Sequence, residues 1–397
     1  MKLKIALAIA LSIPSTAVLA EDGAVKIGVL NDQSSSFSAL GGTEVVHAVE
    51  LAIKDHGGTA LGKPIELVSA DHQNKPEVGL AIARQWLEQD GVDVIADMAN
   101  SAIALGVNTL IGETGKIGLF VSPLTDKPTE ADCNGHVIAW AYDAHSMFTG
   151  PVKALLSDGV KSFFILSPDY EAGKVQEATE EAAIVDGGGT VAGKIRAPLG
   201  STDFSSYLLQ AQASGAEALI LNVSGPDLVN AVKQVQEFGI MASGMQVTLP
   251  ALHQSDARAI GVEAMQGVRF GVPWFWKQDE ASYEFGKRMM EITGNAPGWI
   301  AAGTYSAVSN YLDAVETAGT DDPDAVLKVM HEMEIEDFFI HNSTMYPNGR
   351  LIHDQYSLQV KTPAEVEEKD DFFKLIAAIP AEEAFKPYSE SACTIGK

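Results

Sequence analysis

The sequence has few cysteines and few basic residues. Its two cysteines, Cys133 and Cys393, have neither the Cys-x-x-Cys nor the His-x-x-x-His spacing of a metal site. Lysine and arginine number 27 against 53 aspartates and glutamates, so the formal net charge is −26 and repels phosphate backbones and anionic lipid alike. We therefore expect no metal site and no nucleic-acid partner.

Local catalytic and nucleotide-binding motifs are also missing. There is no G-x-S-x-G elbow and no H-E-x-x-H, and the nine histidines are scattered along the chain. Neither G-x-G-x-x-G nor the Gly-Lys-Ser/Thr of a phosphate loop occurs, so no cofactor is expected. We expect a protein that is not an enzyme. An amidase or esterase whose triad comes from distant residues is a remote alternative.

The N-terminus has the pattern of a secretory signal peptide. Lys2 and Lys4 precede an apolar run over 5–13, and a stretch of small residues ends at Ala20. The run is shorter than the roughly 20 residues that a membrane span needs. We expect cleavage after Ala20, no lipid anchor because no cysteine follows, and a periplasmic location. No later stretch is long and apolar enough to insert into a membrane.

The mature chain is longer than one hydrophobic core usually supports, which predicts two domains. Strand-like apolar runs alternate with segments of helical period in two successive series, which is the pattern of parallel α/β sheets. The expected strands cover 25–30, 65–70, 92–96 and 117–121 in the first series, and 163–166, 190–195, 218–222 and 246–249 in the second. The chain after residue 280 has further helical patterns, which we expect to pack on these two units and not to form a third domain.

Polar residues follow several of these strands, where parallel sheets bind ligands. Asn100 and Ser101 follow one strand, and Ser122 with Thr125 follows another. Helix capping is the alternative role for such residues. The serine-rich loop 32–42 joins the first strand to the first helix and could cradle an anion.

Five segments in this order resemble the branched-chain amino-acid type of ABC-transporter substrate-binding proteins over essentially the whole mature length. They are I-G-V-L-N-D at 27–32, L-V-S-A-D-H-Q-N-K-P at 67–76, S-P-D-Y-E-A-G at 167–173, D-F-S-S-Y-L-L-Q-A-Q-A-S at 203–214 and I-H-D-Q-Y-S-L-Q-V-K at 352–361. The resemblance implies a type I periplasmic binding protein, with two Rossmann-like lobes that close on a ligand.

The resemblance also implies three hinge crossings, which we place near Asp143, Pro273 and Leu351. The first lobe would hold 25–143 and 274–350, the second 144–273 and 351–385, and the tail 386–397 would be tied to the first. The implied function is that of a solute-binding receptor of an ABC importer. Its partners would be a small-molecule ligand and an inner-membrane ABC permease, and we expect a monomer.

Nine ligand-binding residues follow from the resemblance. In the family, serine or threonine hydroxyls and backbone N–H groups bind a carboxylate at two loops, which here hold Asn100 with Ser101 and Ser122 with Thr125. The others line the rest of the cleft, although Tyr142 could equally be packing at the hinge. The predicted residues are Phe37, Asn100, Ser101, Ser122, Thr125, Tyr142, Tyr170, Asn222 and Ser224.

One departure from the family bears on the ligand. Amino-acid binders place a carboxylate after the strand at 246–249, whereas this chain reads L-P-A-L-H-Q at 249–254. A buried unpaired ammonium is costly, so an α-amino acid is disfavoured unless another acid such as Asp32 substitutes. The segment 137–145 is similar to a subgroup that binds aromatic acids. We expect a small, partly apolar carboxylate, with an amino-acid or amide receptor or sensor as the alternative.

The two cysteines are expected to pair. An exported chain passes through oxidising conditions, in which two widely spaced thiols are joined more often than left free. A disulfide between Cys133 and Cys393 would hold the polar C-terminal tail on the first lobe. Two free thiols are the alternative.

Overall fold

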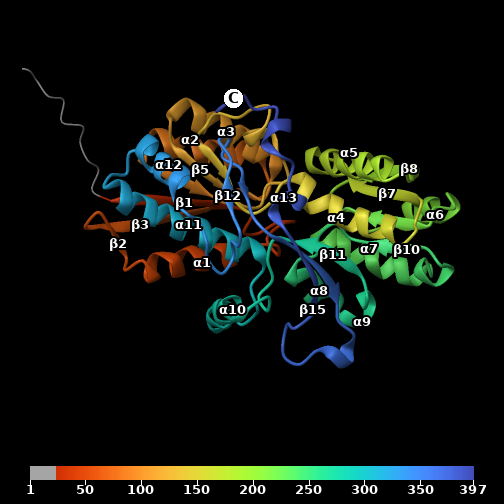
Figure 1. The fold of residues 1–397 in the computed structure, drawn as a ribbon. Coiled ribbons are helices and arrows are strands. Elements are labelled where there is room, and N and C mark those ends of the chain that lie inside the picture. Colours follow the sequence, from red (N-terminus) through yellow and green to blue (C-terminus); the bar gives the residue numbers. More distant parts are fainter. Residues whose placement is uncertain (1–23) are drawn as a thin grey trace, which may run out of the picture.

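The computed structural model describes residues 24–397, which form two lobes that lie side by side (Figure 1). The first lobe contains a six-stranded sheet that is parallel except for the short edge strand β2. Across the sheet its strands are β2 (Thr59–Ala60), β3 (Lys63–Asp71), β1 (Val25–Asn31), β4 (Val94–Ala96), β5 (Ile117–Phe120) and β6 (Val137–Ala139).

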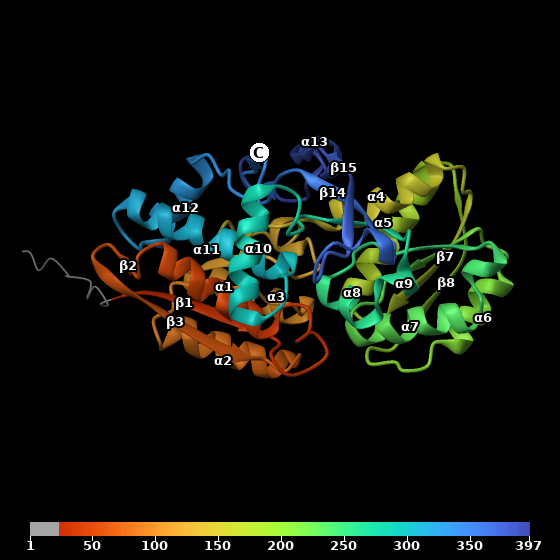
Figure 2. The same cartoon turned by 90° about the horizontal axis from the view of Figure 1, so that it is seen from below.

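Helices cover both faces of this sheet because its central strands are apolar on both sides. Every residue of β4 and β5 is buried, as expected for strands of a covered parallel sheet. Helices α1 (Gly42–Asp55) and α11 (Trp299–Ala318) pack on one face, and α2 (Pro76–Glu88) and α3 (Ser101–Thr114) on the other. Helices α10 (Glu280–Thr293) and α12 (Pro323–Glu332) complete this lobe (Figure 2).

The second lobe is built around a four-stranded parallel sheet. In β7, Phe163 and Ile165 face one helical layer while Phe164 and Leu166 face the other, because successive side chains of a strand point to opposite sides. The strands lie in the order β10 (Gln246–Thr248), β9 (Ala218–Leu221), β7 (Ser162–Pro168), β8 (Thr190–Ala197). The helices are α4 (Ala144–Ser157), α5 (Glu171–Asp186), α6 (Ser205–Ala213), α7 (Gly225–Glu237), α8 (Gln254–Ile260) and α9 (Val262–Met265).

The chain passes between the two sheets three times, after β6, after β11 (Arg269–Val272) and after β13 (Leu351–Ile352). Beside the second lobe, β11 pairs antiparallel with β14 (Gln355–Val360), and β14 with β15 (Phe373–Ile379); β12 (Thr344–Met345) pairs with β13, and α13 (Ala381–Ala384) follows. The α/β fold of two helix-covered parallel sheets confirms the predicted fold class. The exact lobe limits stay predictions.

Two of the crossing segments are bonded to each other. The Arg350 guanidinium donates to the main-chain oxygen of Tyr142 at 2.5 Å, and His353 Nε2 lies 2.9 Å from the main-chain oxygen of Ala141. Both side chains are buried. These contacts hold the first and third crossings side by side, as expected of a hinge whose segments move together.

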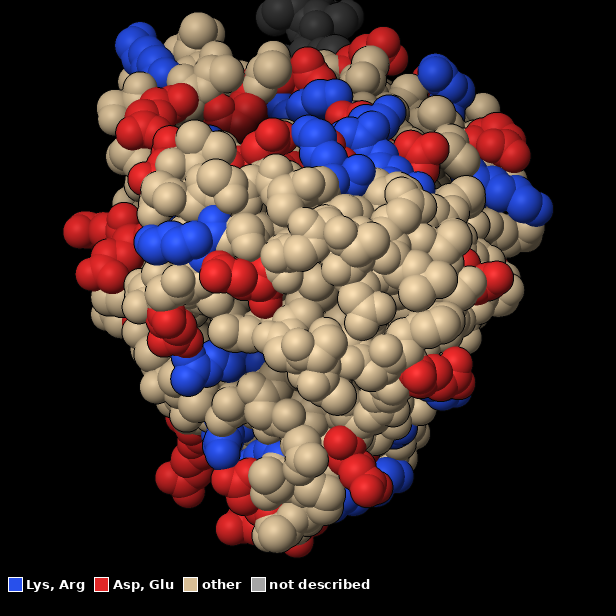
Figure 3. Space-filling view, turned by 90° about the vertical axis from the view of Figure 1, so that its right-hand side faces the viewer, with Lys and Arg blue, Asp and Glu red and all other residues tan. Residues whose placement is uncertain are grey.

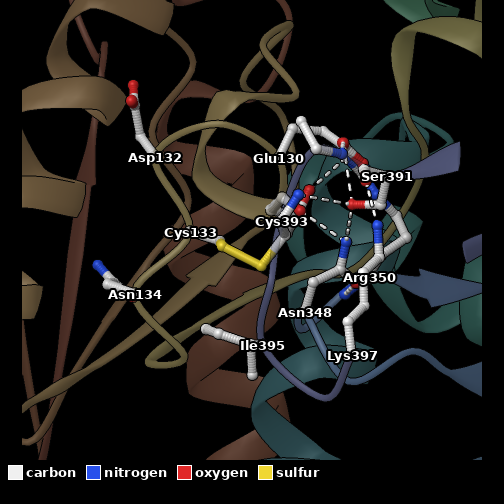
Figure 4. The surroundings of a disulfide bond; sticks show 12 residues. Glu130, Asp132, Cys133, Asn134, Asn348, Arg350, Ser391, Cys393, Ile395 and Lys397 are labelled. Carbon is white, nitrogen blue, oxygen red and sulfur yellow. Dashed lines mark hydrogen bonds between the residues drawn. A yellow bond between two sulfur atoms is a disulfide. The ribbon is translucent and has the colours of Figure 1, made fainter. Parts of the chain in front are cut away.

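The predicted disulfide between Cys133 and Cys393 is confirmed. The Glu130 carboxylate accepts from the main-chain nitrogen of Ala392 at 2.6 Å, and Asn348 donates to Ser391 Oγ at 3.2 Å (Figure 4). The tail is therefore held by one covalent bond and by polar contacts, both with parts of the chain next to the first sheet.

Among residues 24–397, no helix combines the length and hydropathy needed to cross a membrane. The predicted signal peptide lies outside the described residues.

Candidate ligand-binding site

A cavity lies between the two lobes, beyond the carboxyl ends of the parallel strands of both sheets. Of the described residues that line it, none is Asp, Glu, Lys or Arg. From the first lobe the lining comprises Phe37, Leu40, Ala99, Ser122, Leu124, Tyr142, Trp299 and Ile300. From the second it comprises Met147, Phe148, Tyr170, Gln176, Asn222, Val223, Ser224, Pro250, Ala251 and His253.

The structure places six of the nine predicted site residues in this lining and three outside it. Those in the lining are Phe37, Ser122, Tyr142, Tyr170, Asn222 and Ser224, and those outside it are Asn100, Ser101 and Thr125.

Asn100 has the capping role that was its alternative. Its Oδ1 accepts from the main-chain nitrogens of Ala102 at 2.8 Å and Ile103 at 3.1 Å, and its Nδ2 donates to Asn74 at 2.5 Å. The side chain therefore caps the start of α3 with its oxygen and bonds Asn74 through its amide nitrogen.

The hydroxyls of Ser101 and Thr125 are buried and have no hydrogen-bond partner among the described residues. Ser101 is two residues from Ala99, and Thr125 is next to Leu124, both of which line the cavity. Ser101 also opens α3, whose N-terminal end favours negative charge. These two buried hydroxyls therefore lie close to the cavity on the side of the first lobe, without a partner among the described residues.

Aromatic rings form much of the wall. Phe37 from the first lobe and Tyr170 from the second have ring centroids 6.3 Å apart, so these two rings are in contact where the lobes meet. Trp299 packs edge-on against Tyr142 at 5.3 Å and stacks on His253 at 5.1 Å. Such surroundings suit a flat apolar ligand body.

The predicted Ser122 is tied into a buried polar chain. Its hydroxyl contacts the carboxyl of Asp97, and burial raises the pKa of Asp97 to about 6. The Tyr142 hydroxyl donates to the main-chain oxygen of Ser122 at 2.6 Å. The Asp97 carboxyl accepts a hydrogen bond from the Ser122 hydroxyl. Ser122 is therefore less suited to donate to a ligand carboxylate than Ser101 or Thr125.

His253 and Trp299 were missed by the sequence reasoning. Burial lowers the pKa of His253 to about 4, so its imidazole is neutral at pH 7. Its Nδ1 and the Trp299 Nε1 have no partner within residues 24–397. His253 lies in the stretch 249–254, where the acid of amino-acid binders is missing. Trp299 follows no strand, so nothing in the sequence indicated that Trp299 would line the cavity.

Asp32 does not supply the missing acid. Its carboxylate accepts from the main-chain nitrogens of Ser35 and Phe37, both at 2.8 Å, and from Ser35 Oγ at 2.6 Å. The carboxylate therefore shapes the loop that positions Phe37, and it is absent from the lining. No acid of the described chain faces the cavity to pair with a ligand ammonium.

The lobes are in contact around the cavity. Lys127 Nζ of the first lobe lies 2.6 Å from Glu171 Oε1 of the second. A Cβ at Gly225, where α7 begins, would lie 3.3 Å from the main-chain oxygen of Ser36. The structure thus shows a closed arrangement.

A two-lobed α/β protein with an uncharged cavity between its sheets belongs to the class of proteins that enclose small ligands. The family model described as periplasmic binding protein matches residues 24–367. The chain therefore belongs to the periplasmic binding protein family, as its sequence motifs indicated, and this is a family of solute-binding proteins.

Individual relatives agree with this assignment. A periplasmic binding protein from Burkholderia mallei is 36% identical, with a TM-score of 0.91 over 94% of this chain and all of that one. A solute-binding protein of an ABC transporter from Rhodopseudomonas palustris BisB5, solved with 3,4-dihydroxybenzoic acid, is 22% identical, with a TM-score of 0.83 over 91% of this chain and 98% of that one; it shows the fold alone.

A curated relative is the Leu/Ile/Val-binding protein homolog 6 of Brucella melitensis biotype 1 (strain ATCC 23456 / CCUG 17765 / NCTC 10094 / 16M). It is 27% identical over 251 residues, which are 61% of this chain and 62% of the relative. The match thus spans less than two thirds of that relative's length.

Proposed function

We propose that this protein is the periplasmic receptor of an ABC importer and that it binds a small aromatic carboxylate between its lobes. The observation that carries the proposal is the cavity itself, which is lined by aromatic and aliphatic side chains and by uncharged polar groups. The ligand's ring would pack against Phe37 and Tyr170. Its carboxylate would accept from the hydroxyls of Ser101 and Thr125, which lie just behind the lining residues Ala99 and Leu124. The permease partner, the monomeric state and cleavage after Ala20 belong to the same proposal.

The missing acid argues against the amino-acid alternative. An α-amino acid brings an ammonium that needs an anionic partner when it is removed from water. Asp97 is buried behind Ser122, and Asp256, whose pKa burial raises to about 7, lies outside the lining. A carboxylate without an ammonium needs only the neutral donors that the first lobe offers. The 3,4-dihydroxybenzoate held by the Rhodopseudomonas neighbour is of this class.

A thermal-shift and calorimetry series tests the proposal. Benzoate, 4-hydroxybenzoate, leucine and benzamide are added to the mature protein, because a ligand that binds only the folded state raises the melting temperature. Aromatic carboxylates should bind, and both Ser101→Ala and Tyr170→Ala should weaken them about tenfold to a hundredfold. Binding of leucine alone would overturn the proposal.

The same samples test whether the protein acts on its ligand. The spectrum of bound ligand, recorded by NMR after long incubation and release, should be unchanged. The appearance of a hydrolysis product from an ester or amide of the ligand would instead favour the remote esterase or amidase alternative.

A further inference from the structure

We infer that the second-lobe wall of the cavity selects aromatic carboxylates that carry a ring hydroxyl. This hydroxyl would be a hydrogen-bond donor at the end of the ligand away from the carboxylate. Asn222 and Gln176 would accept this bond, and Glu180, which lies behind them, would act as a positioning residue for Asn222. The inference rests on the proposed function and names the substrate class more closely.

The two amides present acceptors that nothing in the described chain satisfies. Asn222 is 3% exposed and Gln176 is 5% exposed, and both line the cavity. Asn222 Oδ1 and Gln176 Oε1 are buried without a hydrogen-bond partner in the part of the chain that the structure describes. Buried polar atoms are nearly always bonded, so a ligand that occupies this end gains by donating to them.

Glu180 and Ser167 determine which atom of Asn222 faces the ligand. The Asn222 Nδ2 group donates to Glu180 Oε2 at 2.7 Å and to Ser167 Oγ at 3.0 Å. Both protons of the amide are therefore used on the side away from the cavity, and Oδ1 is left to face it. Glu180 itself is fully buried on α5 and does not line the cavity.

The two ends of the cavity then differ in hydrogen-bonding character. Near the first lobe, the unpartnered groups are the hydroxyls of Ser101 and Thr125, which can donate to a carboxylate, and the Trp299 indole, which only donates. On the second lobe, Asn222 Oδ1 and Gln176 Oε1 are acceptors without a partner among the described residues, and the neutral imidazole of His253, stacked on Trp299, adds an unpartnered Nδ1. A ligand with an acceptor at one end and a donor at the other matches both.

Matched ligands test the inference on the intact mature protein. Calorimetry would compare benzoate, 4-hydroxybenzoate, 3-hydroxybenzoate and 4-methoxybenzoate, the last of which adds an oxygen but no donor. At least one hydroxybenzoate should bind about tenfold or more tightly than benzoate, and the methoxy compound should gain nothing. Equal binding of all four would overturn this inference and leave the proposed function standing; no binding of any would overturn both.

Variants assign the preference to the amides. Gln176→Leu and Asn222→Leu should reduce the ratio of hydroxybenzoate to benzoate affinity toward one while benzoate still binds, which also reports a folded site. Gln210→Leu is the matched control, since Gln210 is exposed on α6 outside the cavity. A ratio unchanged in both amide variants would refute the assignment.

Glu180 is tested by the same ratio. Glu180→Leu removes the acceptor that orients the Asn222 amide, so the preference should fall. Glu180→Gln retains an acceptor oxygen and should restore it. A merely structural role would weaken benzoate and hydroxybenzoate equally in Glu180→Leu, and that result would exclude the positioning role.

Discussion

Glu180 shows how much the burial of one side chain changes its chemistry. It has no exposed surface, and burial, partly offset by the bond from Asn222, raises its pKa to about 8. The neighbouring Glu177 adds to the rise, but that residue is itself paired with Arg196 at 2.9 Å and Lys194 at 3.1 Å. This rise favours the neutral form of Glu180 at pH 7, in which Oε2 still accepts the hydrogen bond from Asn222.

The pH dependence of stability should report this carboxyl. Its pKa in the folded state lies above the ordinary 4.5, so the native state binds more protons between these two values and stability falls as pH rises through that window. From pH 5 to pH 8 the loss due to Glu180 should be about 3 kcal/mol. Urea unfolding at several pH values measures it.

Glu180→Gln isolates the contribution of this residue. Other acids with raised pKa values, among them Glu44 and Asp256, titrate in the wild type and in the variant alike, so the difference between the two curves belongs to Glu180. The variant should lose less stability than the wild type over this range. Parallel curves would mean that Glu180 is ionised in the folded protein at neutral pH.

At the level of elements, closure brings the loop after β1 against the start of α7. Gly225 has a φ of +57°, which side chains other than glycine rarely adopt, and it faces Ser36 of the other lobe. The close approach is made only when the lobes are together, so the absence of a side chain at this position serves the closed state.

Gly225→Ala should weaken ligand binding by about fivefold to tenfold. When the lobes close, the added methyl would lie closer to the main-chain oxygen of Ser36 than an ordinary van der Waals contact allows. Calorimetry with the best aromatic carboxylate measures the change. Gly215→Ala is the matched control: it also has positive φ, at +72°, with nothing within 4 Å of its Cβ position. An equal loss in both variants would show that backbone strain, and not the contact between lobes, is responsible.

The C-terminal tail is a second element whose role can be tested. Its bridge joins Cys393 to Cys133, 260 residues earlier, and removal of a native disulfide typically costs about 2–5 kcal/mol. The double variant Cys133→Ser/Cys393→Ser should melt at a lower temperature. Ligand affinity should hold, since the tail's contacts with Glu130 and Asn348 lie on one side of the hinge. A marked loss of affinity would show that the tail takes part in closure.

At the scale of the whole molecule, the net charge is a poor guide to local surfaces. Figure 3 looks at the end of the second lobe away from the first and shows a broad area without charged side chains, with acidic and basic groups gathered around it. The stretches 204–216 and 238–255 contain no charged residue. The cavity likewise has no charged lining, although the chain carries −26.

The two lobes are joined by crossing segments that are bonded to each other. We therefore expect ligand binding to shift the molecule from an open to a closed form. Small-angle scattering should give a smaller radius of gyration with saturating aromatic carboxylate than without it. At 100 times Kd, the ligand should also stabilise the fold by about 2.7 kcal/mol. A radius that does not change although calorimetry shows binding would mean that the free protein is already closed.

The sequence by itself determined the elements and their class. Strands and helices are recognised from the pattern of residues close together in the chain, so the alternating apolar runs and helical patterns predicted both parallel sheets. The sequence motifs predicted the family. Exported cysteines predicted the disulfide. Residues that follow strands, such as Tyr170 and Asn222, could be placed at the cavity because strand ends meet at one edge of a sheet. Phe37 was assigned from the family resemblance.

Only the tertiary structure decided what those residues meet. His253 stacks on Trp299 from another lobe, Glu180 of α5 lies behind Asn222 of a different loop, and Asp32 is taken up by its own loop. The same sequence pattern covers a helix cap, as at Asn100, and a buried hydroxyl without a partner among the described residues, as at Ser101. Which role each takes depends on packing between segments far apart in the chain, and no periodicity of neighbouring residues records that packing.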